Sequence, residues 1–285
     1  MSDSIIMIAR KIGIIDAALI RHLEDMRKYA ARTLMVIKGS YYPDLIPIDH
    51  IAEFLRSLAL VDGVILDPDA SIEEFNHNHL QGDMRNSLLI TALPDEELRR
   101  YAEKRIMERT GIEDELQEPS RISSKLLDWA KLESLNLKIN GKLKIGLVSG
   151  SFDLIHLGHV RLINTAKSLC DVLVVATMST SSIRKQDKNV HGDRPIYSQE
   201  DRVTVLSALR STDHIVIFDE LDCKEVIRSL KPDIYFKHQK DMERTVVREE
   251  CGLVRTLGGK VIITTESAGY SSTDIINHMR GLAGK

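Results

Sequence analysis

The chain has 285 residues, a length that suits two domains of ~100–150 residues each. Hydrophobic residues make up 43% and charged residues 28% of it, which are globular proportions and exclude a disordered or fibrous protein. The formal net charge is −3, from 39 basic and 42 acidic residues. Because such a chain has no overall cationic field, we expect neither nucleic acid nor a membrane among its partners.

Targeting and redox signals indicate a cytoplasmic protein. No apolar run approaches the ~20 residues that span a bilayer, and Met1–Asp25 carries acidic residues and a histidine where a signal peptide needs an apolar core. The three cysteines, Cys170, Cys223 and Cys251, are scattered and never in C-x-x-C spacing. This pattern argues against structural zinc and against a disulfide framework, so we predict no metal-ligating residues.

The first half contains a segment that is similar to one in the second half. DLIPIDH (Asp44–His50) aligns with DLIHLGH (Asp153–His159), and both follow a Gly-Ser pair. A competing register aligns SLALVDGVIL (Ser57–Leu66) with ALRSTDHIVIF (Ala208–Phe218). Either register predicts two copies of one fold, and the remaining alternative is chance similarity between α/β segments.

Two polar stretches separate the halves. They are Asp114–Ser124, which contains Pro119, and Asn136–Lys144, which precedes an apolar strand. We place the domain boundary at the second stretch, which gives domains at residues 1–140 and 141–285. The first is expected to be a smaller α/β domain and a degenerate copy of the second.

In the second half, short apolar runs alternate with helix-like segments. The predicted strands are Ile145–Gly150, Asp171–Thr177, His214–Phe218, Asp233–Lys237 and Lys260–Thr264. The predicted helices are Val160–Ser168, Gln199–Arg210, Cys223–Ser229, Val246–Leu257 and Ser272–Met279. Strand, helix and strand within about thirty residues make a βαβ unit with a right-handed crossover. The predicted fold class is therefore α/β, a doubly wound, Rossmann-like parallel sheet.

The string GSFDLIHLGHV (Gly150–Val160) carries the strongest chemical signal. Gly150 ends a strand and a helix follows, so this loop lies at the carboxyl edge of the sheet, where α/β proteins bind ligands. His156 and His159 are three residues apart on one side of the first helical turn, and Gly158 leaves room between them. Two imidazoles and the N–H groups of a helix N-terminus suit a multiply charged phosphate.

A second element, GYSSTDII (Gly269–Ile276), follows the last predicted strand. Ser271, Ser272 and Thr273 stand where a helix N-cap belongs, with Asp274 in the first turn. A capped helix is sufficient to explain these residue types. At the same sheet edge as the histidines, however, their hydroxyls and amides would also form a second phosphate clamp.

Together, GSFDLIHLGH and the terminal Ser-Ser-Thr helix resemble the cytidylyltransferase-like nucleotidyltransferases, from Lys144 to about Arg280. Within that family the chain is most similar to the heptose-1-phosphate adenylyltransferases, which make ADP-heptose. The supporting segments are Ser181–Lys185, Arg194–Glu220, Leu230–Lys237 and Gly258–Val261. Glycerol-3-phosphate and phosphoethanolamine cytidylyltransferases share H-x-G-H but carry R-T-x-G-I-S-T, and Glu266 stands where that arginine would be. A CTP-dependent enzyme of those types is the alternative.

The resemblance implies transfer of a nucleotide from a nucleoside triphosphate, ATP or CTP, to a phosphorylated sugar or alcohol, with release of pyrophosphate. It assigns His156 and His159 to the α-phosphate, and Lys185 and Arg202 to the acceptor phosphate or the leaving group. The residues implied to bind the nucleotide are Gly150, Ser151, Phe152, Asp153, Gly158, Lys237, Ser271, Ser272 and Thr273. Lys185 and Arg202 would otherwise be solvated surface cations. Mg²⁺ would bridge the triphosphate and take few protein ligands.

Two departures from the family pattern bear on this interpretation. The heptose enzymes have Lys-Gly-Gly-Asp where this chain reads KHQKD (Lys237–Asp241), so the substrate or base preference is expected to differ. The first-half copy has Pro47 and Asp49 in place of His156 and Gly158, and an aspartate there would repel a triphosphate. We therefore expect that copy to be catalytically inactive. A homodimer is also expected, and a nucleotide-binding protein without turnover is the non-enzymatic alternative.

Overall fold

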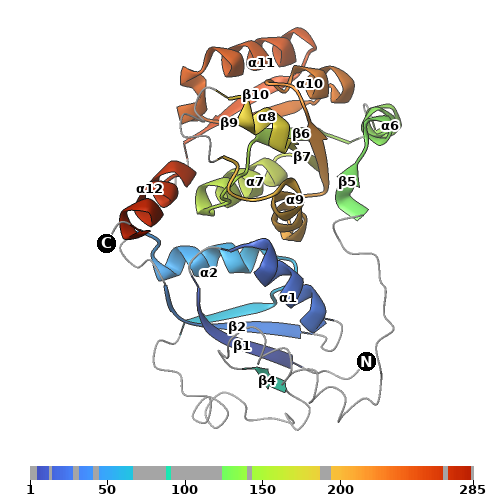
Figure 1. The fold of residues 1–285 in the computed structure, drawn as a ribbon. Helices are drawn as coiled ribbons and strands as arrows, with labels where there is room; N and C mark the ends of the chain where they lie inside the picture. The colour runs from blue at the N-terminus through green and yellow to red at the C-terminus, as the bar shows by residue number, and fades with distance from the viewer. Residues whose placement is uncertain are drawn as a thin grey trace. The chain divides into compact units, whose positions relative to one another are not determined.

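The structure, a computed structural model, describes residues 5–12, 15–27, 32–40, 45–66, 88–90, 124–139, 143–186, 194–265 and 269–283. The chain divides into two compact units, Met1–Pro119 and Ser120–Lys285 (Figure 1). Each unit contains its own parallel sheet. None of the described helices has the length and apolar character that a bilayer crossing requires.

The second unit is built on a six-stranded sheet in the order β10-β9-β6-β7-β8-β5, and every strand pair is parallel. The strands are β5 (Leu126–Leu127), β6 (Ile145–Gly150), β7 (Val172–Met178), β8 (His214–Phe218), β9 (Ile234–His238) and β10 (Lys260–Thr264). The five strands predicted from the sequence are confirmed, with bounds that differ by at most about a residue. The predicted doubly wound α/β class is confirmed with them.

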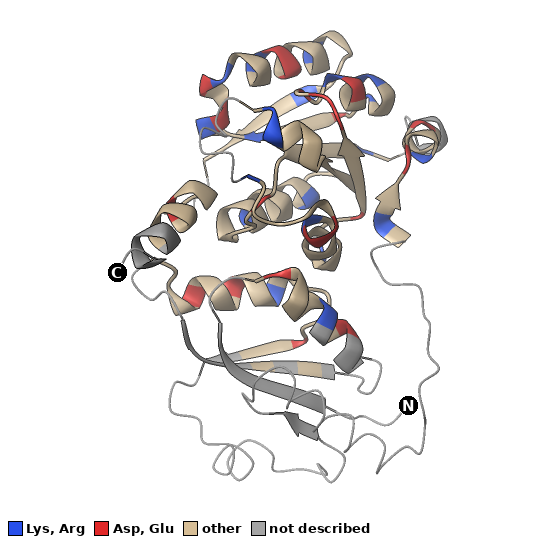
Figure 2. Ribbon diagram, in the orientation of Figure 1, with Lys and Arg blue, Asp and Glu red and all other residues tan. Residues whose placement is uncertain are grey.

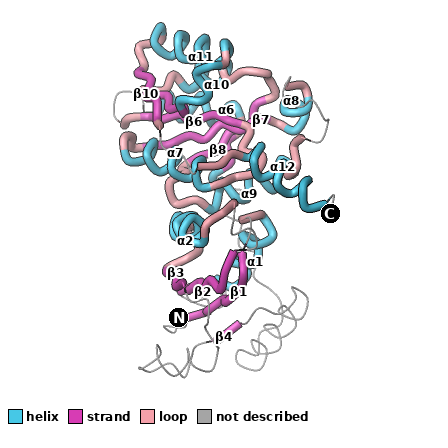
Figure 3. The backbone as a smooth tube through the Cα atoms, turned by 90° about the vertical axis from the view of Figure 1, so that its left-hand side faces the viewer, coloured by secondary structure: helices cyan, strands magenta, loops and turns pink. Residues whose placement is uncertain are grey.

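Helices cover both faces of this sheet, with α10 and α11 on one side and α7 and α9 on the other (Figures 1 and 3). The helices are α6 (Trp129–Ile139), α7 (Leu157–Ser168), α8 (Thr180–Arg184), α9 (Gln199–Ala208), α10 (Lys224–Leu230), α11 (Thr245–Thr256) and α12 (Ser272–Ala283). Because both faces are covered, β6 is buried along its length up to Ser149, which explains its apolar sequence. The short helix α8 was not predicted.

The sheet order places a ligand crevice at one position. β6 pairs with β7 on one side and with β9 on the other, whereas the chain runs from β6 to β7 and reaches β9 only after β8. The order of the strands therefore reverses between β6 and β9. In doubly wound sheets such a switch point opens a crevice outside the carboxyl ends of the strands. Gly150 and His238, the last residues of these two strands, stand at its edge.

Charged residues of both signs are mixed along α10 and α11 (Figure 2). Lys224 Nζ lies 2.8 Å from Glu249 Oε2 and links the two helices. Partly exposed pairs of this kind contribute only about 0–1 kcal/mol to stability. Burial of apolar side chains against the sheet carries more of the packing, from Val226, Ile227, Leu230, Val247 and Val254.

The structure begins the second unit earlier than residue 141. β5 pairs with β8 through Leu126 and Leu127, and Leu132 of α6 is fully buried in the core beneath α10. Lys125 Nζ also donates to the Leu209 carbonyl at 3.0 Å. These contacts place the division after Pro119. A two-residue edge strand inside a polar stretch gives too weak a pattern for sequence reasoning to detect.

The described part of the first unit is a four-stranded parallel sheet in the order β3-β2-β1-β4. Its elements are β1 (Ile5–Ile12), α1 (Ala17–Arg27), β2 (Arg32–Ser40), α2 (Ile48–Ser57), β3 (Gly63–Leu66) and β4 (Leu88–Ile90). Numbered from β1 in the first unit and from β6 in the second, both sheets contain the order 3-2-1-4, which is common to many doubly wound sheets. This order alone leaves the repeat a prediction.

The topology of the two sheets, and not the hydrogen bonds that precede their strands, favours one of the two registers. In the first unit the N–H of Asp62 bonds to the Thr33 carbonyl at 2.9 Å, and its carboxylate accepts from the Thr33 N–H at 2.7 Å. In the second unit Asp213 makes the same two bonds to Leu173, at 3.2 and 2.7 Å. Asp171 also makes the same two bonds, to Lys144 at 2.9 and 2.7 Å, so these bonds fit either register. The register built on His50 conflicts with the topology, because its segment follows the second strand of its sheet and not the first.

In the favoured register the counterpart of the second unit's histidine loop lies before α1. Asp16 precedes that helix and its Oδ1 accepts from the Leu19 N–H at 2.8 Å. These two residues occupy the positions that His156 and His159 hold before and within α7. An aspartate at this point would repel a polyphosphate, so the expectation of an inactive copy stays, with different residues responsible.

The domain division can be tested with two fragments. A fragment of residues 120–285 keeps β5 and the buried Leu132, whereas a fragment of residues 144–285 exposes the core that they cover. We expect the thermal unfolding midpoint of the shorter fragment to be lower by at least about 5 °C, because it loses several kcal/mol of buried contacts. Circular dichroism melts measure the difference, and equal midpoints would place the division at residue 140 instead.

Candidate functional site

The loop after β6 makes a tight turn into the crevice. Phe152 has a φ of 47°, in the left-handed region that residues other than glycine rarely adopt. Its ring is buried and lies over Gly150, where a Cβ atom would come within 3.3 Å of the ring. Glycine at the end of β6 therefore permits the ring to fold back over the strand. The loop then leads to α7, which begins at Leu157.

Two imidazoles cap the N-terminus of α7. His156 is the N-cap residue, and its Nδ1 accepts from the Gly158 N–H at 3.1 Å. The Nδ1 of His159 accepts from the His156 N–H at 3.3 Å, which completes a reciprocal capping box. Because Nδ1 is an acceptor in both neutral rings, the proton of each ring is assigned to Nε2. The ring centroids are 4.0 Å apart. The predicted position of both histidines in one helical turn is confirmed.

The environment of His156 keeps this ring neutral. Burial, followed by repulsion from the neighbouring His159, lowers the pKa of His156 to about 2, although Asp274 acts in the opposite direction. At neutral pH the ring is therefore a neutral N–H donor.

The start of α12 lies beside these rings. Ser271 caps the helix: its hydroxyl accepts from the Asp274 N–H at 3.3 Å and donates to the Asp274 carboxylate at 2.7 Å. Ser272 instead donates to the Leu154 carbonyl at 2.8 Å and ties α12 to the histidine loop. Thr273 Oγ1 accepts from Arg194 at 3.0 Å. The backbone amides of this first turn point toward the helix N-terminus, where anions bind.

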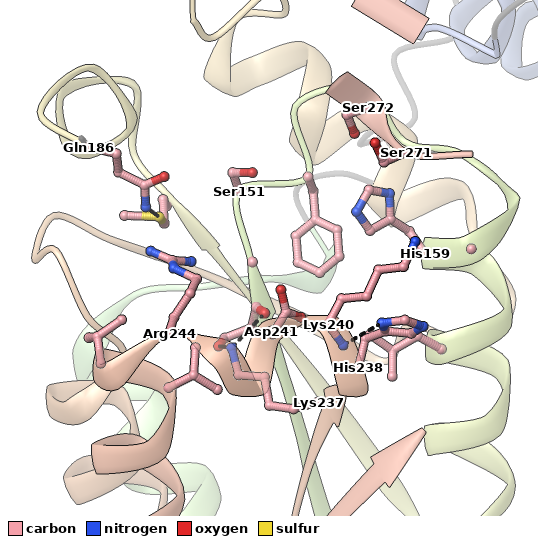
Figure 4. Close-up of a pocket in the computed structure, with 18 of the residues that line it drawn as sticks. Ser151, His159, Gln186, Lys237, His238, Lys240, Asp241, Arg244, Ser271 and Ser272 are labelled. Atoms are coloured by element: carbon pink, nitrogen blue, oxygen red, sulfur yellow. Dashed lines mark hydrogen bonds between the residues drawn. The ribbon is translucent and has the colours of Figure 1, made fainter. Parts of the chain in front are cut away.

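One pocket of about 320 Å³ joins these groups. Figure 4 shows His159, Ser271 and Ser272 at one end of it, and Gln186 and Arg244 at the other. Lys237 lies at the floor between the two ends. The imidazole and the hydroxyls at the start of α12 therefore lie together at one end of the pocket.

The ammonium group of Lys237 is held by the protein itself. Its Nζ lies 2.9 Å from Ser149 Oγ, 3.2 Å from the Ser149 carbonyl and 3.4 Å from Glu250 Oε2, and the side chain is 7% exposed. Glu250 also accepts from the Tyr235 hydroxyl at 2.8 Å and from the Cys223 N–H at 2.7 Å. Two hydrogen bonds to Ser149 and the ion pair with Glu250 therefore engage this ammonium. Lys237 therefore adds positive charge to the pocket floor while its donors stay engaged.

The segment after β9 brings side chains to the pocket. A 3₁₀ helix (Gln239–Glu243) follows His238, whose Nδ1 accepts from the Lys240 N–H at 3.1 Å. His238, Lys240 and Asp241 all line the pocket. This is the stretch in which glycines had been expected from the family pattern, so side chains here narrow the space that bare backbone would leave.

The comparisons with known proteins agree with this geometry. A family profile described as cytidylyltransferase-like matches residues 147–278, a segment that contains both histidines and the start of α12. Residues 147–278 thus match the cytidylyltransferase-like domain, and this segment is called by that name below. This confirms the family that the H-x-G-H string had indicated.

Curated relatives of the cytidylyltransferase-like domain share its sequence at a similar level. The chain is 40% identical to the bifunctional protein HldE of Paramagnetospirillum magneticum, and 37% identical to that of Caulobacter vibrioides. Each match covers 48% of this chain and 27% of the relative, so the chain matches about a quarter of their length. Among solved structures, it is similar to the lipopolysaccharide core biosynthesis protein of Thermoplasma volcanium, with 24% identity, a TM-score of 0.36 and coverage of 44% of this chain and 98% of that one.

Most of the residues predicted for the site line the pocket of the cytidylyltransferase-like domain. They are Gly150, Ser151, Phe152, His156, Gly158, His159, Lys237, Ser271, Ser272 and Thr273. Three others lie outside it: Lys185 is the C-cap residue of α8, Asp153 is buried under the loop, and Arg202 is fully buried. Arg202 is thus neither a surface cation nor a pocket residue. Burial lowers its pKa, whereas Asp153 and Glu200 raise it.

Sequence reasoning missed several other residues that line the pocket. They are Met178, Gln186, Phe218, Leu221, Asp222, Arg244, Val246, Val247 and Glu250. Several of them stand at or just beyond the carboxyl ends of β7 and β8, which is where ligand-binding residues of doubly wound sheets are found. These residues are scattered along the sequence without a regular spacing. Their position near the carboxyl edge of the sheet was therefore the only signal that could have identified them as pocket residues.

The charge on Glu250 can be tested through stability. Glu250→Gln keeps the shape of the side chain but leaves the buried Lys237 without its counter-charge, so we expect a loss of about 3 kcal/mol in the free energy of unfolding. The double variant Lys237→Met/Glu250→Gln should lose less than the two single variants added together. Urea unfolding followed by the fluorescence of Trp129, the single tryptophan, reports on this unit. Glu249→Gln, which breaks the more exposed pair with Lys224, is the control and should cost about 1 kcal/mol or less.

The low pKa of His156 predicts a pH dependence of stability. As the pH falls below about 6.5, the unfolded chain protonates this histidine and the folded chain does not until about pH 2. The stabilisation is therefore complete above about pH 6.5 and is lost progressively toward acid. His156→Asn keeps an N-cap side chain but does not titrate, so between pH 7.5 and 5 it should lose about 2 kcal/mol less than the parent. The same urea titrations at both pH values measure this, and equal losses would contradict it.

Proposed function

We propose that this chain is a nucleotidyltransferase that transfers a nucleoside monophosphate from a nucleoside triphosphate to a phosphorylated sugar or alcohol and releases pyrophosphate. The observation that carries the proposal is the pair of imidazoles that caps α7 in the same pocket as the first turn of α12. The match of that segment to cytidylyltransferase-like proteins supports the same reaction class.

The reaction needs positioning and charge stabilisation from the protein. An oxygen of the acceptor phosphate attacks the α-phosphorus, the bond from that phosphorus to the bridging oxygen breaks, and pyrophosphate carries the electron pair away. His156 and His159 donate from Nε2 toward the α-phosphoryl and bridging oxygens, where negative charge increases. The N-terminus of α12 holds the β- and γ-phosphates. Lys237 adds a fixed positive charge from the pocket floor.

Mg²⁺ is proposed to enter with the nucleotide. No group of three metal-ligand side chains occurs among the described residues, and two pocket carboxylates are already engaged, Asp222 with Lys224 and Glu250 with Lys237. The residues present therefore fit an ion that the phosphate oxygens hold, as Mg²⁺ with few protein ligands often is. When bound, such an ion would offset the charge of the triphosphate.

The acceptor is proposed to be a sugar phosphate, with ATP as the nucleotide. The resemblance to heptose-1-phosphate adenylyltransferases and the identity of about 40% to bifunctional HldE proteins support this choice. A CTP-dependent enzyme acting on glycerol 3-phosphate or phosphoethanolamine is the second candidate. Glu266, which argued against it, lies outside the described residues. We propose that the protein acts as a cytoplasmic homodimer, which light scattering of the purified chain tests.

The reaction itself is tested by a pyrophosphate-release assay. ATP, CTP, GTP and UTP are each paired with heptose 1-phosphate, glycerol 3-phosphate and phosphoethanolamine. We expect release with ATP and the sugar phosphate. Release with CTP and an alcohol phosphate alone would favour the second candidate. Nucleotide binding without release in any pairing would identify a binding protein that has lost turnover.

Loss of either capping imidazole should reduce turnover. His156→Ala and His159→Ala each remove a donor to the transition state, which typically costs on the order of 10²–10³ in kcat. The fold should persist, because only the first turn of α7 is changed. Steady-state pyrophosphate release measures kcat, and a circular dichroism spectrum confirms folding. Near-normal rates in both folded variants would remove these histidines from the mechanism.

Substitutions of the hydroxyl residues at the start of α12 distinguish phosphate binding from helix capping. Ser271 caps the helix, whereas Ser272 and Thr273 do not, so Ser272→Ala/Thr273→Ala leaves the cap in place. If these two hydroxyls contact phosphate, the double variant should raise the KM for nucleotide at least about tenfold. Ser271→Ala is the control and should instead cost about 1 kcal/mol of stability. Nucleotide titration and melting curves on both variants make the comparison, and an unchanged KM in the double variant would leave the segment with a structural role alone.

A further inference from the structure

The guanidinium of Arg202 lies beneath the loop that leads to the histidines. The side chain is fully buried, and its Nη1 donates to the Ser151 carbonyl at 2.7 Å and to Thr177 Oγ1 at 2.8 Å. Thr177, at the end of β7, is also fully buried and donates to the same carbonyl at 3.2 Å. Two donors from separate elements therefore meet at one carbonyl of the loop.

That carbonyl belongs to the peptide that sets the strained backbone of Phe152. The peptide between Ser151 and Phe152 must rotate to give Phe152 its φ of 47°, which costs energy for a residue with a Cβ atom. A conformation of this kind persists only where the surroundings hold it. The hydrogen bonds from Arg202 and Thr177 hold it from one side.

A second anchor lies on the other side of Phe152. Asp153, which is 1% exposed, accepts through Oδ1 from the Ile196 N–H at 2.8 Å and from the Tyr197 N–H at 3.1 Å. These amides belong to the segment that leads into α9, the helix that carries Arg202. This segment and α9 therefore hold the loop by hydrogen bonds on both sides of Phe152.

The arrangement leaves charge that is only partly paired in the interior. Asp153 Oδ2 and the Nε and Nη2 atoms of Arg202 have no hydrogen-bond partner among the described residues. Burying polar atoms without hydrogen-bond partners lowers the stability of the protein, so packing alone does not account for Arg202 and Asp153 at these positions. The hydrogen bonds of these two side chains go to the Ser151 carbonyl in the loop, to Thr177 at the end of β7 and to the segment that leads into α9.

Phe152 connects this anchor to the chemistry. Its ring lines the pocket and meets the His159 ring edge-on, with centroids 5.3 Å apart. Because Phe152 is fixed at its backbone and its ring packs on His159, a change in the loop moves the wall against which His159 rests. A displacement of about 1 Å in a reacting group can cost on the order of 10²-fold in rate.

We propose that Arg202 is a positioning residue, which acts through the Ser151 carbonyl and Phe152 to place His159, and that it does not touch substrate. This inference rests on the proposed function for its effect on rate, and it differs from the direct contact with the acceptor phosphate or leaving group that the family resemblance implies. Direct contact requires an arginine that faces the pocket, whereas this one is buried outside it.

A double-mutant cycle distinguishes the two roles. Arg202→Met should lower kcat by on the order of 10²-fold in the parent and by less than about threefold in a His159→Ala background, because both changes disturb one group. Thr177→Val, which keeps the shape of the side chain, should lower kcat by about tenfold through the same carbonyl. Arg210→Met, at an exposed position beyond α9, is the matched control and should leave kcat unchanged.

Direct contact predicts the opposite pattern. The losses from Arg202→Met and His159→Ala would then multiply, the KM for the acceptor would rise, and Thr177→Val would have no effect because Thr177 lies outside the pocket. That pattern would overturn the proposal. If Arg202→Met does not fold, the near-isosteric Thr177→Val carries the same test.

A measurement without substrate keeps the proposal separate from the proposed function. Side-chain NMR of the ligand-free protein follows the imidazole signals of His159, with His214 and His278 as remote references. In Arg202→Met and Thr177→Val the His159 signals should shift well beyond those of the references. If they stay in place in folded variants, Arg202 does not position His159. A parent protein that binds no nucleotide and releases no pyrophosphate would refute the proposed function alone.

Discussion

The first amides of α7 are capped by imidazoles in place of the hydroxyl or carboxylate that usually occupies an N-cap, and the character of the pocket follows from this. An acidic cap would put negative charge where phosphate must rest, whereas a neutral ring that accepts through Nδ1 has its N–H on the other side of the ring. His156 and His159 cap each other's turn, so the helix and the pair of donors depend on the same two hydrogen bonds. Burial keeps His156 in the neutral form that this arrangement needs.

Two buried polar systems support the capped turn from below. On one side, Arg202 and Asp153 hold the loop on both sides of Phe152. On the other, Glu250 joins β9, α11 and the start of α10, and holds Lys237 at the floor of the pocket. Each system buries charge, which costs stability, and each does so directly beneath the pocket. The interior of this unit is therefore more polar at the carboxyl edge of the sheet than in the apolar cluster behind it.

The first unit shows what the same topology looks like without this cap. Its sheet has the same strand order over the described residues, and Asp62 repeats the backbone bonds of Asp213. At the counterpart of the histidine turn, however, Asp16 caps α1 with a carboxylate and Leu19 takes the place of the second imidazole. Helix α1 therefore has an N-cap too, but a carboxylate at this position does not attract phosphate. A capped α/β turn is thus a property of the fold, and a phosphate site is a property of the capping side chains.

The sequence by itself determined five of the six described strands of the second unit, most of its helices, its sheet class and the two segments that meet at the sheet edge. Apolar runs of strand length and the H-x-G-H spacing are local, so hydrogen bonding within one or two turns is enough to express them. The tertiary structure decided what Arg202 and Lys237 do, because a cation in sequence gives no sign of whether a carbonyl, a carboxylate or solvent will meet it. It also decided the place of β5, which depends on pairing with Ile215, a residue far away along the chain. Burial and long-range pairing are set only when the sheet closes, and they place Lys237 in the lining of the pocket and Arg202 in the interior outside it.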